Sequence, residues 1–309
     1  MMFSKVIFFN HHHNGDLHLS RGLVRHTIQV LSGLDPNIEV VYTHSNGPYV
    51  LKDINAKYDG NIINTLSQSA GSYIKDNCLY INTWYGADNF IFLNKYGISF
   101  DCLFFIFDEL FKKHFNLTLH RDFRSLFPII SFDEYRINSS KQWLDDHKNF
   151  KKVLVSNAQA KSGQAPNFNF IPAIKSLALS CPKTIFIITN KEPGINFKSH
   201  ANVVFSPDII KSSDTDLNEN AFLGTFCDII VGRASSVFTF CFNQKTLFNQ
   251  DVKMVSFSYE TENYAHYLKS DWLGESLRSK IDYKTNITHS SANNGNAACK
   301  IIKGLLNGK

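Results

Sequence analysis

Three consecutive histidines, an Asn-Gly pair and an aspartate stand together in the segment FFNHHHNGDLHLSRGLVRHT at 8–27. Carboxylate and imidazole groups can both take a proton from a hydroxyl group near neutral pH. Gly15 permits a tight turn, because glycine tolerates positive φ, and Asp16 follows where a helix is expected to begin. The segment therefore indicates either a helix N-cap at Asp16 or the rim of an active site, with Asp16 or His13 as general base.

The polar residues beside Asp16 are candidates for contacts to an acceptor substrate: His11, His12, Asn14 and Gly15. A metal site is a weaker interpretation of the three histidines. Consecutive residues of an extended chain point to alternating sides, so three in a row do not easily converge on one ion. We expect no metal at this loop.

A second polar loop, SNAQAKSGQAPN at 156–167, follows an apolar run. Its amides, glycine, hydroxyl and lysine suit a phosphate group. The loop does not have the spacing G-x-x-x-x-G-K-[ST], and the chain has no G-x-G-x-x-G. The candidate donor-binding residues here are Asn157, Lys161, Ser162 and Gly163.

A third candidate site lies in DIIVGRASSVFTF at 228–240, where an apolar strand gives way to a helix. Hydroxyls, backbone N–H groups and a guanidinium at a helix start can hold an anion. A polar loop with serine caps is the alternative interpretation. The candidate donor-binding residues are Gly232, Arg233, Ser235 and Ser236.

The segment SSDTDLNEN at 212–220 contains Asp-Thr-Asp, which is similar to a metal-binding Asp-x-Asp motif. Its place before a predicted helix favours a different function. Asp216 and Glu219 fit a variant of the capping box. Asn218 and Glu219, in the first helical turn, are candidates for hydrogen bonds to a sugar or ribose hydroxyl.

The elements around these motifs repeat one order. Strand, polar loop, helix and strand follow one another from 5 to 44 and again from 152 to 190, which is typical of βαβ units with parallel strands. The chain therefore predicts two doubly wound, Rossmann-like α/β domains, 1–148 and 149–309, with a linker in 139–152. In such sheets, ligands bind at the loops beyond the carboxyl ends of the strands.

Later parts of the chain continue the pattern. Strands are predicted at 202–206, 227–232 and 253–258, with a helix from about 217 and an amphipathic helix at 298–308. The stretch 84–127 is rich in aromatic residues. Phe107, Leu110, Phe111 and Phe115 share one helical face, which favours a core helix over a membrane-surface helix or lid.

Composition excludes several classes. The chain has 309 residues, 27 Phe and a net charge of +5 that is not concentrated in one run, so a dedicated nucleic-acid-binding surface is not expected. The six cysteines form no C-x-x-C pair, and the apolar start is too short for a signal peptide core. We expect reduced thiols and a cytoplasmic protein.

The three loops together resemble those of the GT-B glycosyltransferases, and among them the bacterial ADP-heptose lipopolysaccharide heptosyltransferase-like group. The shared features are Asn14-Gly15-Asp16 at the first helix start, Lys161-Ser162 in the second domain, and the late turn at 232–236. The resemblance implies two domains facing a central cleft, with the acceptor on the first, the nucleotide sugar on the second, and the last helix packing back on the first.

It also implies glycosyl transfer without a metal or other cofactor, to a glycan or lipid-linked glycan, in surface-polysaccharide or lipopolysaccharide synthesis. Peripheral contact with the inner membrane surface fits such acceptors. Two other classes remain open: a nucleotide-sugar epimerase, and a non-catalytic sugar-nucleotide-binding protein.

Overall fold

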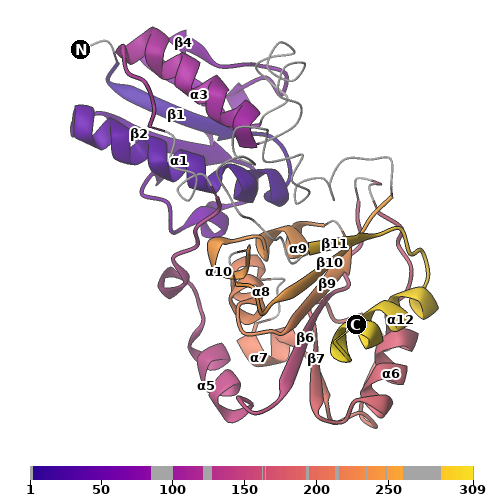
Figure 1. The fold of residues 1–309 in the computed structure, drawn as a ribbon. Coiled ribbons are helices and arrows are strands. Elements are labelled where there is room, and N and C mark those ends of the chain that lie inside the picture. Colours follow the sequence, from indigo (N-terminus) through magenta and orange to yellow (C-terminus); the bar gives the residue numbers. More distant parts are fainter. Residues whose placement is uncertain are drawn as a thin grey trace. The chain divides into compact units, whose positions relative to one another are not determined.

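The computed structural model describes residues 3–84, 100–120, 127–161, 163, 165–192, 195–212, 216–233, 235–247, 249–259 and 287–308. In this part, the chain divides into two units, the first ending at Ile130 and the second beginning at Ser131 (Figure 1). Each unit has its own sheet and hydrophobic core. None of the described helices is both long and apolar enough to cross a membrane.

The sheet of the first unit has the strand order β3-β2-β1-β5-β4. Its strands are β1 (Lys5–Asn10), β2 (Glu39–His44), β3 (Lys57–Tyr58), β4 (Tyr73–Lys75) and β5 (Cys78–Asn82). The described helices are α1 (Asn14–Leu34), η1 (Pro48–Leu51), η2 (Ile62–Thr65) and α3 (Phe100–Phe115). β1 pairs in parallel with β2 and β5, whereas β4 runs antiparallel to β5. The predicted strands at 5–10 and 38–44 are thus confirmed, and β3, β4 and β5 are additions.

The helices of the first unit bury apolar faces against β1. Leu17, Val24 and Leu31 recur at helical spacing along α1 and are buried. From α3, Phe107 stacks on Phe8 of β1 at a centroid distance of 6.0 Å. Phe111 of α3 is also fully buried. The predicted core role of α3 is therefore confirmed.

The sheet of the second unit has the order β11-β10-β9-β6-β7-β8, and all its pairs are parallel. Its strands are β6 (Lys151–Ser156), β7 (Thr184–Ile188), β8 (Val203–Phe205), β9 (Ile229–Arg233), β10 (Lys253–Phe257) and β11 (Ile287–Ser290). The described helices are η3 (Phe132–Glu134), α5 (Asn138–Asp146), α6 (Ile171–Ser180), α7 (Ser206–Ile210), α8 (Leu217–Gly224), α9 (Ser236–Phe240), α10 (Gln244–Leu247) and α12 (Gly295–Leu306). This is the predicted parallel α/β arrangement.

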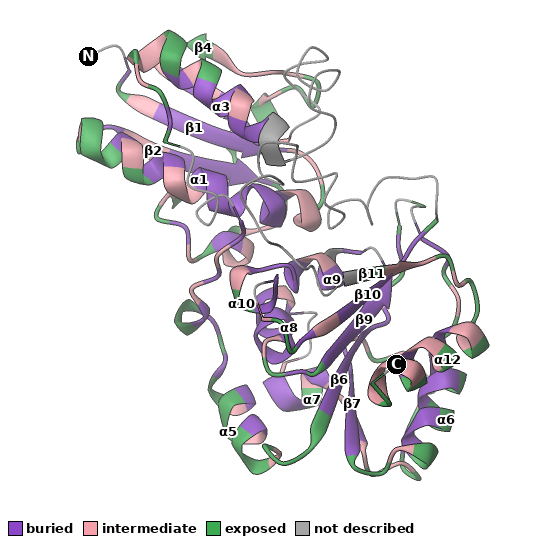
Figure 2. Ribbon diagram, in the orientation of Figure 1, coloured by how far each residue is buried: buried purple, intermediate pink, exposed green. Residues whose placement is uncertain are grey.

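Alternate residues of the central strands face opposite layers of helices. Val153 and Val155 belong to a core cluster with α6 and α12, which lie side by side (Figure 1). Leu154 of β6 instead faces Gly224 of α8. The strands are buried on both faces, as Figure 2 shows by their purple colour, so they consist of nearly continuous apolar runs.

One domain boundary and the packing of the last helix differ from the expectations. The segment predicted as a linker contains α5, which packs on α7, and Ser139 Oγ donates to the carbonyl of Ile210 at 3.1 Å. The first unit therefore ends at Ile130, earlier than the predicted 148. The final helix α12 packs on α6 of its own unit through Ala298 and Ile302, where the sequence predicts packing on the first domain.

Candidate functional site

Buried polar residues line the carboxyl edge of the first sheet. Asn10 ends β1 and pairs in register with His44 at the end of β2. Asn82 ends β5 on the other side of β1. All three side chains are almost completely buried. Ligands of open α/β sheets bind beyond the carboxyl ends of the strands, so this polar edge is a candidate functional site.

Asp16 lies in the first turn of α1, directly beyond this edge. Its Oδ2 accepts the backbone N–H of His13 at 3.2 Å, which closes a capping box with the N-cap residue His13. The carboxylate is half-buried, and desolvation raises its pKa to about 6, against the opposing effects of His13 and of backbone N–H donors. Asp16 is thus part of the cap and also a carboxylate tuned toward neutral pH.

A buried hydroxyl network lies below the Asp16 loop. Tyr42 Oη is 3.2 Å from Ser20 Oγ and 2.9 Å from Thr83 Oγ1. Thr83 Oγ1 in turn accepts from Asn10 Nδ2 at 3.0 Å. Burial raises the pKa of Tyr42 to about 12, and the Asp16 charge acts in the same direction. The network ties the start of α1 to the ends of β1, β2 and β5.

The three histidines of the loop have different surroundings. His11 packs edge-on against Phe9, and His12 lies against Trp84 at a centroid distance of 3.9 Å. His13 is exposed. Burial lowers the pKa of both His11 and His12. Nε2 of His11 and of His12 and Oδ1 of Asn14 are buried and have no hydrogen-bond partner among the described residues. Gly15 lies after Asn14 in the first turn of α1.

In the second unit, Asn157 follows β6 and is buried. Its Oδ1 accepts the backbone N–H of Asn190 at 2.9 Å, and its Nδ2 donates to Glu192 Oε1 at 2.9 Å. These bonds join the carboxyl ends of β6 and β7. Asn157 therefore positions the loops there, and its predicted direct contact with the donor stays a prediction.

Arg233, at the end of β9, is 3 % exposed, and its guanidinium is bound to the loop after β6. Nε donates to the carbonyl of Pro166 at 3.0 Å, and Nη1 and Nη2 donate to the carbonyls of Asn157 and Phe168. The guanidinium also lies over the Phe170 ring at 4.9 Å. Arg233 thus holds the 157–168 loop in place, and its predicted contact with a phosphate stays a prediction.

Gly232 is required by close packing. A Cβ there would lie 2.6 Å from Cβ of Ser156 and 3.0 Å from the Phe238 ring. The hydroxyls of Ser156, Ser235 and Ser258, all buried near the carboxyl ends of β6, β9 and β10, have no hydrogen-bond partner among the described residues. Buried hydroxyls without a partner need an explanation, so this set is a candidate for hydrogen bonds to an anion or a sugar.

The remaining residues of the predicted donor site are more open. Lys161 and Gly163 are exposed in the loop after β6, and Gly163 has φ of +74°. Ser162 lies outside the described residues. Ser236 begins α9, but its side chain lies outside the described part. Lys161 is thus the cation that this loop offers to a ligand.

Asn218 and Glu219 are both buried in the first turn of α8. Glu219 Oε1 accepts the backbone N–H of Arg136 at 3.3 Å, and its carboxylate lies 3.7 Å from Nε of that residue. Asp216 is the N-cap residue, but its Oδ1 binds Nη2 of Arg136. Glu219 is thus buried and paired with Arg136, and its predicted contact with a sugar hydroxyl stays a prediction.

Several residues of the candidate site could not be singled out from the sequence. A single polar residue at a strand end carries no functional signal in the sequence, and this applies to Asn10, His44 and Thr83. They are brought together by the register of the strands, which the sequence does not reveal. Among the described residues, no group of three or more His, Cys, Asp or Glu side chains is arranged to hold a metal ion.

No protein-family model and no curated protein matches the sequence. Solved structures do match in fold. The E. coli heptosyltransferase WaaC with ADP-2-deoxy-2-fluoro heptose matches with a TM-score of 0.51 and 10 % sequence identity, over 97 % of this chain and 99 % of that chain. The S. aureus MnaA-UDP co-structure matches with a TM-score of 0.50 and 11 % identity, over 98 % of this chain and 88 % of that chain. These similarities confirm the predicted fold, two Rossmann-like α/β domains of the kind found in the heptosyltransferases.

Proposed function

We propose that this protein is a glycosyltransferase, which moves a sugar from a nucleotide-sugar donor to a hydroxyl of a glycan or lipid-linked glycan. The observation that carries the proposal is the environment of the Asp16 carboxylate. A half-buried carboxylate with a pKa raised to about 6 lies beyond the carboxyl edge of a parallel sheet, beside a loop of histidines. A general base works best when its pKa is near the operating pH.

In this proposal the acceptor binds to the first unit. Asp16 takes the proton of the acceptor hydroxyl as its oxygen attacks the anomeric carbon, and His13 is the alternative base. The bond from the anomeric carbon to the diphosphate oxygen breaks, and the diphosphate leaves with the electron pair. His11, His12 and Asn14 are suited to hold the acceptor, because each presents an unpaired polar atom or ring there.

The donor binds to the second unit. Lys161 offers a positive charge, and the unpaired hydroxyls of Ser156, Ser235 and Ser258 offer hydrogen bonds to the phosphates or the sugar. Arg233 and Asn157 act as positioning residues that shape the loop. We propose that these groups stabilise the leaving diphosphate without a metal ion.

The pathway and the cellular location are inferred from the resemblance to the heptosyltransferases. We infer a role in bacterial surface-polysaccharide or lipopolysaccharide synthesis, in the cytoplasm, with contact to the inner membrane where a lipid-linked acceptor requires it. The shared fold with WaaC and MnaA, solved with an ADP-sugar analogue and with UDP, supports a nucleotide-sugar donor.

A thermal-shift screen against nucleoside diphosphates and nucleotide sugars tests the donor. A ligand at 100 times its dissociation constant adds about 2.7 kcal/mol to the free energy of unfolding. Product analysis then separates the classes. A glycosyltransferase needs an acceptor for sugar transfer. Conversion of the nucleotide sugar without an acceptor would indicate an epimerase, and binding without turnover would indicate a sugar-nucleotide-binding protein.

A further inference from the structure

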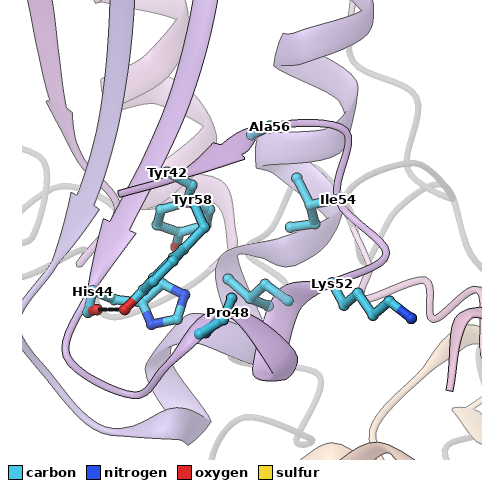
Figure 3. A pocket seen from close by; sticks show the side chains of 8 residues that line it. Tyr42, His44, Pro48, Lys52, Ile54, Ala56 and Tyr58 are labelled. Atoms are coloured by element: carbon cyan, nitrogen blue, oxygen red, sulfur yellow. Dashed lines mark hydrogen bonds between the residues drawn. The ribbon is translucent and has the colours of Figure 1, made fainter. Parts of the chain in front are cut away.

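A cavity of about 170 Å³ lies in the first unit beside the carboxyl end of β2 (Figure 3). Leu51, Ile54 and Ala56 supply aliphatic surface, and Tyr42 and Tyr58 supply aromatic rings. An engineered cavity of about 150 Å³ binds a benzene ring. The space therefore fits one six-membered ring or a branched alkyl group of similar size.

Both tyrosine hydroxyls are used within the protein. Tyr42 Oη lies within hydrogen-bond distance of Ser20 and Thr83, and Tyr58 Oη donates to the carbonyl of His44 at 2.8 Å. The tyrosines can thus offer the cavity mainly their rings, so that a ligand meets apolar walls.

Apart from the tyrosines, the lining includes two polar side chains, His44 and Lys52. Figure 3 shows Lys52 extending away from the other labelled side chains, so His44 is the polar group that we assign to the interior of the cavity. Its ring, 1 % exposed, lies beside Pro48 in Figure 3. Nδ1 accepts the backbone N–H of Asn46 at 3.3 Å, so the neutral ring carries its proton on Nε2. Burial lowers the pKa of His44 to about 4 and keeps the ring neutral. Nε2 has no hydrogen-bond partner among the described residues, so this N–H can donate to a ligand.

The segment 50–53, which contains Leu51, is held by two arginines of α1: Arg21, which is buried, and Arg25, which is half-buried. Arg21 Nη2 donates to the carbonyl of Val50 at 2.6 Å and lies 3.7 Å from Asp53 Oδ1. Arg25 Nη2 donates to Asp53 Oδ2 at 2.7 Å. These bonds fix the segment that contains Leu51, so the cavity is preformed.

We propose that this cavity binds a compact apolar group that carries one hydrogen-bond-accepting oxygen. The oxygen accepts from Nε2 of His44, and the rest of the group packs on Leu51, Ile54 and the tyrosine rings. The apolar walls disfavour a sugar ring of the same size, because the hydroxyls that face these walls would lose their hydrogen bonds to water.

The position of the cavity gives this group a role. Asn46 Nδ2 donates to the carbonyl of His12 at 3.3 Å, and His44 aligns with Asn10, so the cavity adjoins the loop that leads to Asp16. This role rests on the proposed function: in a glycosyltransferase, the bound group is the apolar aglycone of the acceptor. An aryl group and a branched or cyclic alkyl group share the required chemistry.

Cyclohexanol and myo-inositol are matched probes, since both are six-membered carbon rings but they carry one and six hydroxyls. We expect cyclohexanol to bind the full chain and shift the methyl resonances of Ile54 in an NMR titration, and myo-inositol to leave them unchanged. Phenol in the same titration distinguishes an aromatic source from an aliphatic one. Equal binding of myo-inositol, or no shift with either cyclohexanol or phenol, would overturn the proposal.

Variants locate the binding. Ala56→Leu fills the cavity and should abolish cyclohexanol binding, whereas the same change at the exposed Ala201 should not. His44→Phe keeps a ring but removes the donor, and should weaken binding about 5- to 10-fold. Unchanged affinity in folded Ala56→Leu would contradict the assigned site. Because these titrations need no nucleotide sugar, cyclohexanol binding without any donor binding would reject the proposed function and leave the cavity proposal intact.

Discussion

Asp16 combines two roles that normally favour different environments. As part of a capping box it accepts the His13 N–H, which favours the ionised form, yet desolvation outweighs this and raises its pKa to about 6. A group whose pKa is raised on folding prefers its protonated form in the folded state. The ionised carboxylate at neutral pH is therefore a cost to stability that a purely structural cap would not carry.

We predict that Asp16→Asn raises the free energy of unfolding at neutral pH by about 1 to 2 kcal/mol. One pKa unit corresponds to about 1.4 kcal/mol, and solvent screening of a half-buried group reduces the full shift. The Asn oxygen still accepts from His13. The gain should be fully present at pH 7, decrease as the pH falls through 6, and disappear toward pH 3, below the ordinary carboxyl pKa of 3.8, where the parent carboxyl is protonated in both states. Denaturant unfolding at neutral and at acidic pH measures it; a loss of stability at neutral pH would contradict the raised pKa.

At the scale of elements, the loop after β6 depends on a cation that belongs to β9. Arg233 binds carbonyls of Asn157, Pro166 and Phe168, which converge on its guanidinium from one loop. A lysine has a single ammonium group and cannot reproduce this fork of donors. Lys161 lies exposed in the same loop and has no such task in the structure.

We predict that Arg233→Lys lowers the free energy of unfolding by about 2 to 4 kcal/mol, because several buried carbonyls lose a charged donor. Lys161→Met is the matched change of a cation in the same region, and it should leave stability within about 0.5 kcal/mol while weakening donor binding. Chemical denaturation and donor titration of both variants decide the roles. If Arg233→Lys were as stable as the parent but bound donor weakly, Arg233 would contact the phosphate directly.

The elements themselves could largely be predicted from the sequence. Apolar runs such as 152–157 and 253–258 are continuous because their strands are buried on both faces. Such runs can be recognised as strands from the sequence. α5 was missed because it is short and polar, with only Ser140 and Leu144 buried. From the sequence, Glu219 was expected to be accessible to a ligand, because it lies in the first turn of a helix. Its burial against Arg136 depends on two segments 83 residues apart, which no local pattern reveals.

At the scale of the whole molecule, the chain forms two units, each with its own sheet and its own hydrophobic core. The repeated strand–loop–helix–strand order predicted this division, and the similarity to WaaC confirms the fold. The boundary at Ile130 was missed, because the segment before β6 is charged like a linker but packs as α5.

We predict that transfer activity survives EDTA. In the proposed reaction, the negative charge that develops on the diphosphate is met by Lys161 and the unpaired hydroxyls of the second unit, so no ion is needed there. Initial rates with and without EDTA, and after the addition of Mg²⁺ or Mn²⁺, provide the measurement. A strict requirement for a divalent ion would contradict this part of the mechanism.

The role of Asp16 as general base is tested most directly by the transfer rate of Asp16→Asn at saturating donor and acceptor. Removal of a general base typically lowers the rate about 10²- to 10⁴-fold. We predict a decrease in this range with unchanged donor affinity and a folded protein. We also predict that the parent rate rises with pH through about 6, as the carboxylate ionises. A folded variant that binds donor normally and turns over near the parental rate would show that Asp16 is only a cap, and would contradict the account.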